Sequence, residues 1–237
     1  MSDEKIQIAV IDYQLGNLFS IRHALNHVGL SAMITSDHTE ILQADAVILP
    51  GVGAFGDAMN SLHQLDLVSP LQDIAQSEIP LIGICLGLQL LFTESHEFGR
   101  HKGLGIIDGE VVPFKPTRHA GKVYKVPQVC WNRIFGPDEG ELTLESRQVT
   151  AWNRSLLSGI KNGSFRYFIH SFYGSPEHPS DTLTRTIYGP TSFCSAVKKG
   201  SVEAFQFHPE RSGPIGLTVY QNLRILLRKK RGEAYDE

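Results

Sequence analysis

One short segment constrains the fold of this chain more than any other: an apolar run reaches a cysteine and continues as a helix. It reads Pro80-Leu81-Ile82-Gly83-Ile84-Cys85-Leu86-Gly87-Leu88-Gln89-Leu90-Leu91. Glycines stand two residues before and two residues after Cys85, which is the thiol version of the G-x-S-x-G nucleophile elbow. Small residues are needed because strand and helix meet in a sharp turn that exposes the central side chain. A nearby helix N-terminus favours the thiolate, so Cys85 is a candidate nucleophile; a buried structural cysteine is the alternative.

The surrounding pattern predicts an α/β fold. In the first half, short apolar runs at residues 6–11, 31–35, 46–49 and 80–84 alternate with helix-like segments, which is typical of a parallel sheet covered by helices. Asn17 is expected to cap the first helix and Gly29 to stop it, and residues 57–77 are expected to be helical with a break near Pro70.

The second half of the chain differs from the first. Short runs at residues 110–114, 142–145, 165–169, 193–197 and 202–207 alternate with turn residues and predict further strands, partly antiparallel, before a last helix that follows Pro214. We therefore expect a three-layer fold whose central, mostly parallel sheet is flanked by helices and carries an antiparallel portion. Neither a repeat nor a linker divides the chain, so residues 1–237 are expected to form a single domain.

Composition excludes several classes of function. The chain has 22 Lys+Arg against 25 Asp+Glu, a formal net charge of -3, so it lacks the basic field that binds nucleic acid or an anionic membrane. Its longest apolar run, residues 79–92, is shorter than the roughly 18 residues that cross a bilayer. Cys85, Cys130 and Cys194 have no C-x-x-C spacing, which disfavours a disulfide framework or a zinc site and favours a reduced, cytoplasmic location.

A base for the thiol is found in the run Phe205-Gln206-Phe207-His208-Pro209-Glu210. On an extended backbone, His208 and Glu210 would lie on one face, where the carboxylate could orient the imidazole and stabilise its protonated form. A zinc site is a poor alternative because no H-E-x-x-H occurs, and His23 with His27 is more simply an exposed pair on a helix. We therefore predict that His208 is the base and Glu210 its orienting acid, without a metal or cofactor.

A glycine-rich loop follows the strand at residues 46–49. Residues 51–56 match G-x-G-x-x-G, but Pro50 intervenes and the loop does not follow the first strand, so a dinucleotide site is rejected. The remaining interpretations are a tight turn or a loop whose backbone N–H groups bind a developing oxyanion.

Taken together, these features resemble the class I (triad) glutamine amidotransferases, with Cys85, His208 and Glu210 at the positions of the nucleophile, base and acid. Further segments resemble the glutaminase subunits of imidazole glycerol phosphate synthases: Ile11-Asp12-Tyr13, Gly16-Asn17-Leu18, Pro50-Gly51-Val52-Gly53-Ala54-Phe55, Trp131-Asn132, and Phe168-Ile169-His170-Ser171-Phe172-Tyr173. The resemblance spans essentially the whole chain. It implies that L-glutamine is hydrolysed through a cysteine thioester and that ammonia passes to a cyclase subunit, a (β/α)8 barrel, in a heterodimer.

The resemblance also implies roles for single residues. The oxyanion donors would be the N–H of Leu86 and the loop at Val52 and Gly53. Substrate would be contacted by Gly51, Gly87, Gln89, Glu97, His170 and Ser171, with Glu94 competing for the role of Glu97. The partner would dock at Asp12, Tyr13, Asn17 and Trp131, although Trp131 could instead be a core aromatic.

The chain departs from this family in places that bear on its partner. Cys130 replaces the usual glycine before Trp131, Gln14-Leu15 replaces smaller residues, and extra polar residues occur at 117–122 and 137–154. The alternative within the enzyme class is an ammonia supplier for the amidation of surface-polysaccharide sugars with a paralogous cyclase-like partner. Outside that class, a non-catalytic regulatory module and a stand-alone cysteine hydrolase are the competing hypotheses.

Overall fold

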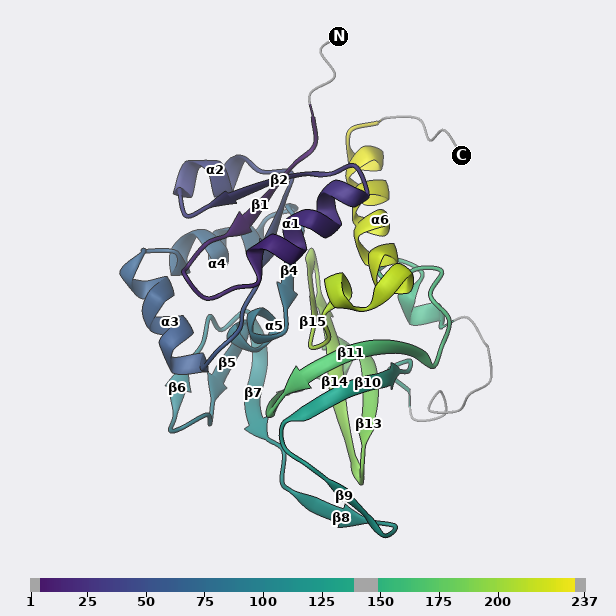
Figure 1. Ribbon diagram of the computed structural model, residues 1–237. Helices are drawn as coiled ribbons and strands as arrows, with labels where there is room; N and C mark the ends of the chain where they lie inside the picture. Colours follow the sequence, from purple (N-terminus) through teal and green to yellow (C-terminus); the bar gives the residue numbers. More distant parts are fainter. Residues whose placement is uncertain (1–4, 139–148, 233–237) are drawn as a thin grey trace.

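A twisted central sheet organises the computed structural model, which describes residues 5–138 and 149–232 (Figure 1). Within these residues, seven strands pair in the order β13-β14-β15-β4-β3-β1-β2. They are β1 (Gln7–Ile11), β2 (Ser31–Thr35), β3 (Ala46–Leu49), β4 (Leu81–Ile84), β13 (Thr182–Tyr188), β14 (Thr191–Lys199) and β15 (Val202–Phe205). The strands from β15 to β2 are parallel, whereas β13, β14 and β15 are antiparallel neighbours. The predicted fold class is confirmed.

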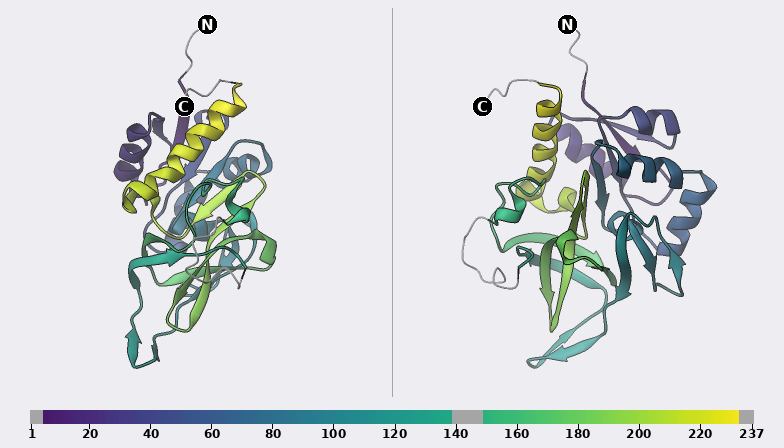
Figure 2. Two further views of the ribbon diagram at one scale, coloured as in Figure 1. Left: turned by 90° about the vertical axis from the view of Figure 1, so that its right-hand side faces the viewer. Right: turned by 180° about the vertical axis from the view of Figure 1, so that it is seen from behind.

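Helices cover both faces of this sheet (Figures 1 and 2). They are α1 (Leu18–His27), α2 (His38–Gln43), α3 (Phe55–Gln64), α4 (Val68–Gln76), α5 (Leu86–Leu90) and α6 (Gly213–Lys230), with the short 3₁₀ turns η2 (Thr150–Trp152), η3 (Pro179–Asp181) and η4 (Pro209–Arg211). Side chains alternate along β1, so Ile8 and Val10 pack in the core under α1 and α6, whereas Ala9 and Ile11 pack in the core under α2, α3 and α4. None of the described helices could span a membrane.

Additional strands extend the molecule beside the central sheet. A second sheet has the order β12-β7-β5-β6, and two separate pairs are formed by β8 with β9 and by β10 with β11. These strands are β5 (Phe92–Ser95), β6 (His101–Lys102), β7 (Ile107–Pro113), β8 (Thr117–His119), β9 (Lys122–Tyr124), β10 (Gln128–Ile134), β11 (Ser164–His170) and β12 (Phe172–Pro176). The β8–β9 hairpin projects from the body of the molecule (Figure 2). The extra residues at 117–122 therefore form an arm.

Some local predictions were wrong in detail. The helical stretch predicted over 57–77 is two helices, and the interruption lies between Gln64 and Val68 rather than near Pro70. Pro70 lies in the first turn of α4, where its missing N–H removes no helical hydrogen bond. Asn17 precedes α1 as expected, but its side chain makes no capping hydrogen bond. The strand predicted at 142–145 lies outside the described residues.

The packing of α5 against the end of β3 generates a first prediction. A Cβ at Gly87 would lie 1.9 Å from the backbone oxygen of Leu49, a contact that neither buried backbone can relieve easily. We expect Gly87→Ala to lower the free energy of unfolding by about 2–3 kcal/mol, measured by urea denaturation. The control is Gly200→Ala, at a turn glycine whose Cβ would meet nothing within 4 Å and whose φ of +59° accounts for a loss of about 1 kcal/mol without any clash. Equal losses in the two variants would contradict the proposed clash.

Candidate active site

The site lies where several parallel strands end at one edge of the central sheet. Because β1, β3, β4 and β15 are parallel, the segments that follow them meet at the same edge. These segments hold Tyr13 after β1, the glycine loop at residues 50–53 after β3, Cys85 after β4 and His208 after β15. The topology thus brings together groups that are far apart in the sequence.

The turn between β4 and α5 has the geometry of a nucleophile elbow. Cys85 adopts φ 56° and ψ −108°, a strained conformation for a residue other than glycine. The turn is held at both ends, because the N–H of Cys85 donates to the oxygen of Phe205 at 2.8 Å and its own oxygen accepts from Leu88 at 3.1 Å. Gly83 allows the close approach, since a Cβ there would lie 2.8 Å from the Cβ of Ala204.

His208 and Glu210 form a buried pair beside this elbow. Nδ1 of His208 lies 2.8 Å from Oε1 of Glu210, and the two side chains are 4% and 0% exposed. The sequence predicts an extended backbone for the pair, whereas in the structure the 3₁₀ turn η4 folds Glu210 back toward the imidazole. Since Nδ1 faces the carboxylate, Nε2 is the nitrogen left for chemistry with Cys85, and it is buried.

The electrostatics of the pair favour a charged imidazole. Burial works to lower the pKa of His208, but the charge of Cys85 and the hydrogen bond and charge of Glu210 raise the pKa overall, to about 10. His208 is therefore protonated at pH 7 and is a proton donor beside the thiol of Cys85.

These groups open into a cavity of about 430 Å³. It is lined by Asn17, Val52, Gly53, Cys85, Leu86, Gln89, Glu97, Pro127, Ile169, His170, Ser171, Phe172, His208 and Arg211. The predicted oxyanion residues and most of the predicted substrate residues are thus in one cavity. Gly51 and Gly87 are not in the lining: they pack beneath it, where a Cβ on Gly51 would come within 2.9 Å of the nitrogen of Gly87. Arg211, which directly follows the His-Pro-Glu run, also lines the cavity and was not among the predicted site residues.

An amide chain that sequence reasoning missed supports the thiol. Nε2 of Gln89 donates to the oxygen of Phe172 at 2.9 Å and to Oε1 of Gln206 at 3.1 Å. Nε2 of Gln206 in turn donates to Sγ of Cys85 at 3.8 Å. Gln206 could have been found in the sequence because it is a polar residue within the apolar run that precedes His208.

The fold places the two candidate glutamates in different surroundings. Glu97 lines the cavity and its Oε2 accepts from the N–H of Phe55 at 2.6 Å, at the start of α3. Burial raises the pKa of Glu97. Glu94 lies elsewhere: Arg100 donates to it at 2.8 Å.

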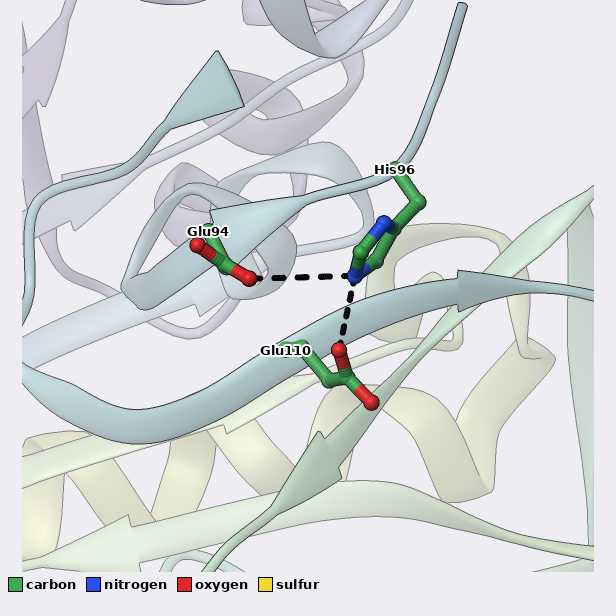
Figure 3. Close-up of side chains that lie close together, drawn as sticks. All are labelled: Glu94, His96 and Glu110. Atoms are coloured by element: carbon green, nitrogen blue, oxygen red, sulfur yellow. Dashed lines mark hydrogen bonds and ion pairs between the residues drawn. The ribbon is translucent and has the colours of Figure 1, made fainter. Parts of the chain in front are cut away.

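Glu94 belongs instead to an ion-pair cluster on the second sheet (Figure 3). Nε2 of His96 lies 2.7 Å from Glu110 and 3.8 Å from Glu94. The ligand atoms of these three residues lie within 4.8 Å of one another, the spacing of a possible metal site. Their contacts are those of ordinary ion pairs, and His96 and Glu110 are exposed.

The residues expected at a partner interface divide into two groups. Trp131 is 51% exposed, so the core alternative for it was wrong, and Asp12 and Asn17 are half-buried. Tyr13 is only 1% exposed and packs under the glycine loop, so its side chain offers a partner little surface, and its assignment to the interface stays a prediction. Cys194 is buried, whereas Cys130 is half-buried because it lies on the two-stranded β10–β11 ribbon.

Comparison with known proteins agrees with this geometry. The family model for class-I glutamine amidotransferases matches residues 9–223, and the chain belongs to this family. Imidazole glycerol phosphate synthase subunit HisH of Wolinella succinogenes is 40% identical over 91% of this chain and 97% of its own length. The HisH subunit of Syntrophotalea carbinolica is 44% identical over 91% of this chain and 98% of its own. The solved structure of PurLQS from Thermotoga maritima has the same fold, with a TM-score of 0.66 at 16% identity over 94% of this chain and 99% of that one.

His170 generates a prediction on stability against pH. Its Nδ1 lies 2.7 Å from the oxygen of Phe172, and burial lowers its pKa to about 4. Between about pH 6.5 and pH 4, the unfolded chain therefore binds a proton that the folded chain does not, so stability falls as pH falls through this window. We expect this extra slope, up to about 1.4 kcal/mol per pH unit, to disappear in His170→Asn.

The measurement is urea unfolding of both chains at several pH values. His23→Asn, at an exposed histidine of α1, is the control for the loss of a histidine in general. Identical slopes for the wild-type chain and His170→Asn would show that His170 is not held neutral.

Proposed function

We propose that this chain is the glutaminase subunit of an imidazole glycerol phosphate synthase, which hydrolyses L-glutamine and passes the ammonia to a cyclase subunit in histidine biosynthesis. The observation that carries the proposal is the similarity to HisH subunits, which are 37–44% identical to this chain over about nine-tenths of its length. A thiol, an imidazole and a carboxylate beside one cavity support it. The proposal takes residues 1–237 as one domain, working in the cytoplasm without a cofactor.

In the first step, the Cys85 thiolate attacks the side-chain amide carbon of glutamine. The carbonyl oxygen becomes an oxyanion, and His208 donates its Nε2 proton to the departing nitrogen, which leaves as ammonia. Glu210 keeps the proton on Nδ1 and stabilises the imidazolium. The product of this half-reaction is a glutamyl thioester on Cys85.

In the second step, water hydrolyses the thioester. His208, now neutral, removes a proton from the attacking water, and collapse of the second tetrahedral intermediate releases glutamate and regenerates the thiolate with protonated His208. Both intermediates need oxyanion donors. The N–H of Leu86 has no acceptor within its helix because it opens α5, and Val52 and Gly53 border the same cavity. Each donor contributes about 10²–10³ in rate.

Substrate selection is assigned to the rest of the cavity wall. Glu97 offers a carboxylate to the α-amino group of glutamine. Gln89, His170 and Ser171 line the same cavity and would contact other parts of the substrate, and His170 does so as a neutral ring at pH 7.

The partner surface is assigned to the outer face of the β10–β11 ribbon. We call Val129, Trp131, Phe165, Tyr167 and Ile169 the docking face. Strand register places Val129 opposite Ile169 and Trp131 opposite Tyr167, so these side chains share one side of the ribbon. Val129, Trp131, Phe165 and Ile169 are 40–52% exposed, and such an exposed apolar cluster is typical of an interaction site. Ile169 also lines the cavity, so a partner covering this face would lie next to the source of ammonia.

A kinetic assay tests the proposal. We expect the chain to release glutamate slowly alone and faster when the histidine-pathway cyclase subunit, saturated with its nucleotide substrate, is added, because the two sites are coupled. Cys85→Ala should abolish release under both conditions, with partner binding retained. The readout is glutamate formed per minute.

Each outcome of this assay has a meaning. Retained turnover in Cys85→Ala would contradict the nucleophile assignment. Full activity without a partner would favour a stand-alone hydrolase. No activation, with Cys85 still labelled by a glutamine-mimicking electrophile, would move the ammonia to another acceptor, such as surface-sugar amidation.

The docking face generates a separate prediction. Trp131→Ala should weaken binding of the cyclase subunit at least about tenfold, because an aromatic in the centre of an interface contributes strongly. Binding is measured by calorimetry, and the rate at which iodoacetamide labels Cys85 should stay unchanged. Ile225→Ala, at a 40% exposed residue of α6 outside the docking face, is the matched control. Equal affinities for the two variants would place the interface elsewhere.

A further inference from the structure

One buried hydrogen bond joins the segment after β1 to the glycine loop. The hydroxyl of Tyr13 donates to the backbone oxygen of Pro50 at 2.7 Å, and Tyr13 is 1% exposed. We propose that Tyr13 is a positioning residue: its hydroxyl anchors the Pro50–Gly51 peptide, from which the loop extends to the oxyanion donors proposed at Val52 and Gly53. This inference rests on the proposed glutaminase function.

The hydroxyl lies at the junction of the loop and the elbow. A Cβ on Gly51 would be 2.6 Å from the Tyr13 oxygen, 2.7 Å from Cβ of Leu86 and 2.9 Å from the nitrogen of Gly87. Gly51 is therefore enclosed by the phenol on one side and the start of α5 on the other. Because a peptide unit is planar and trans, fixing the Pro50 oxygen also fixes the direction of the Gly51 N–H.

The segment that carries Tyr13 is itself packed against the glycine loop. A Cβ on Gly16 would lie 3.1 Å from the ring of Pro50, and one on Gly53 would lie 3.9 Å from the side chain of Leu15. Residues 13–16 therefore pack against residues 50–53, and the Tyr13 hydroxyl adds a hydrogen bond to this packing. The two segments are expected to move as one unit.

Loss of the hydroxyl would leave a buried carbonyl without its donor. Pro50 is buried, and an unsatisfied buried carbonyl is unfavourable enough to drive the peptide toward other orientations. Burial and the nearby charge of Cys85 both raise the pKa of Tyr13, so the phenol remains a donor while the thiolate is present. Because an oxyanion exists only in the transition states and intermediates, misplacing its donors lowers kcat and leaves KM largely unchanged.

The test is Tyr13→Phe, assayed as glutamate release with the cyclase subunit present. We expect kcat to fall about tenfold and KM to stay within about twofold. Alkylation of Cys85 by iodoacetamide forms no oxyanion, so its rate should stay within about twofold of the wild-type rate. The matched control is Tyr188→Phe, which removes another tyrosine hydroxyl that donates to a backbone oxygen, that of Lys125 at 2.8 Å. Its kcat should stay within about twofold.

Three results would overturn the inference. An unchanged kcat in Tyr13→Phe would mean that the hydroxyl does not position the loop. A raised KM at constant kcat would assign Tyr13 to substrate binding. A parallel fall in kcat and alkylation rate would indicate general distortion of the elbow. Absence of Cys85-dependent glutamate release in the wild-type chain is a different result, since it overturns the proposed function itself.

Discussion

The backbone conformation of Cys85 is the constraint on which the rest of the site depends. A positive φ at a residue with a Cβ costs on the order of 1–3 kcal/mol, and it persists only where the surrounding structure imposes it. Here β4 is buried along its whole length between β3 and β15, and the cysteine N–H is held by Phe205. Gly51, Gly83 and Gly87 supply the space, because a Cβ at any of them would collide with a neighbour. Core packing therefore maintains the strained turn that presents the thiol.

The charges of the site follow from the same burial. Glu210 is fully enclosed and pairs with His208, whose pKa is raised by Cys85 and Glu210 against the effect of burial. His170 lines the same cavity, its Nδ1 faces the backbone oxygen of Phe172, and burial lowers its pKa to about 4. At pH 7, His208 is therefore positively charged and His170 is neutral, although both line one cavity. The difference arises from the groups beside each ring. This separation supplies one proton donor without adding a second positive charge.

Local spacing predicted the parts of the molecule whose contacts are close in sequence. The Gly83-Ile84-Cys85-Leu86-Gly87 run indicated the elbow, and the alternation of apolar runs and helical segments indicated the α/β fold. The spacing of His208 and Glu210 indicated a pair, although a 3₁₀ turn joins them instead of an extended strand. Gln206 was missed because its partner Gln89 is 117 residues away, and no short-range pattern reports such a contact.

The sequence by itself determined which residues can act as nucleophile or base and which segments turn sharply. These features depend only on single side chains and on their immediate neighbours in the chain. Only the tertiary structure decided which of them meet. The parallel order β15-β4-β3-β1 brings four chain segments to one sheet edge, places Glu97 rather than Glu94 in the cavity and buries Tyr13 beneath the glycine loop. The physical reason is that strand pairing and core packing, which are non-local, set the positions of the loops, whereas the sequence near each loop sets only its local shape.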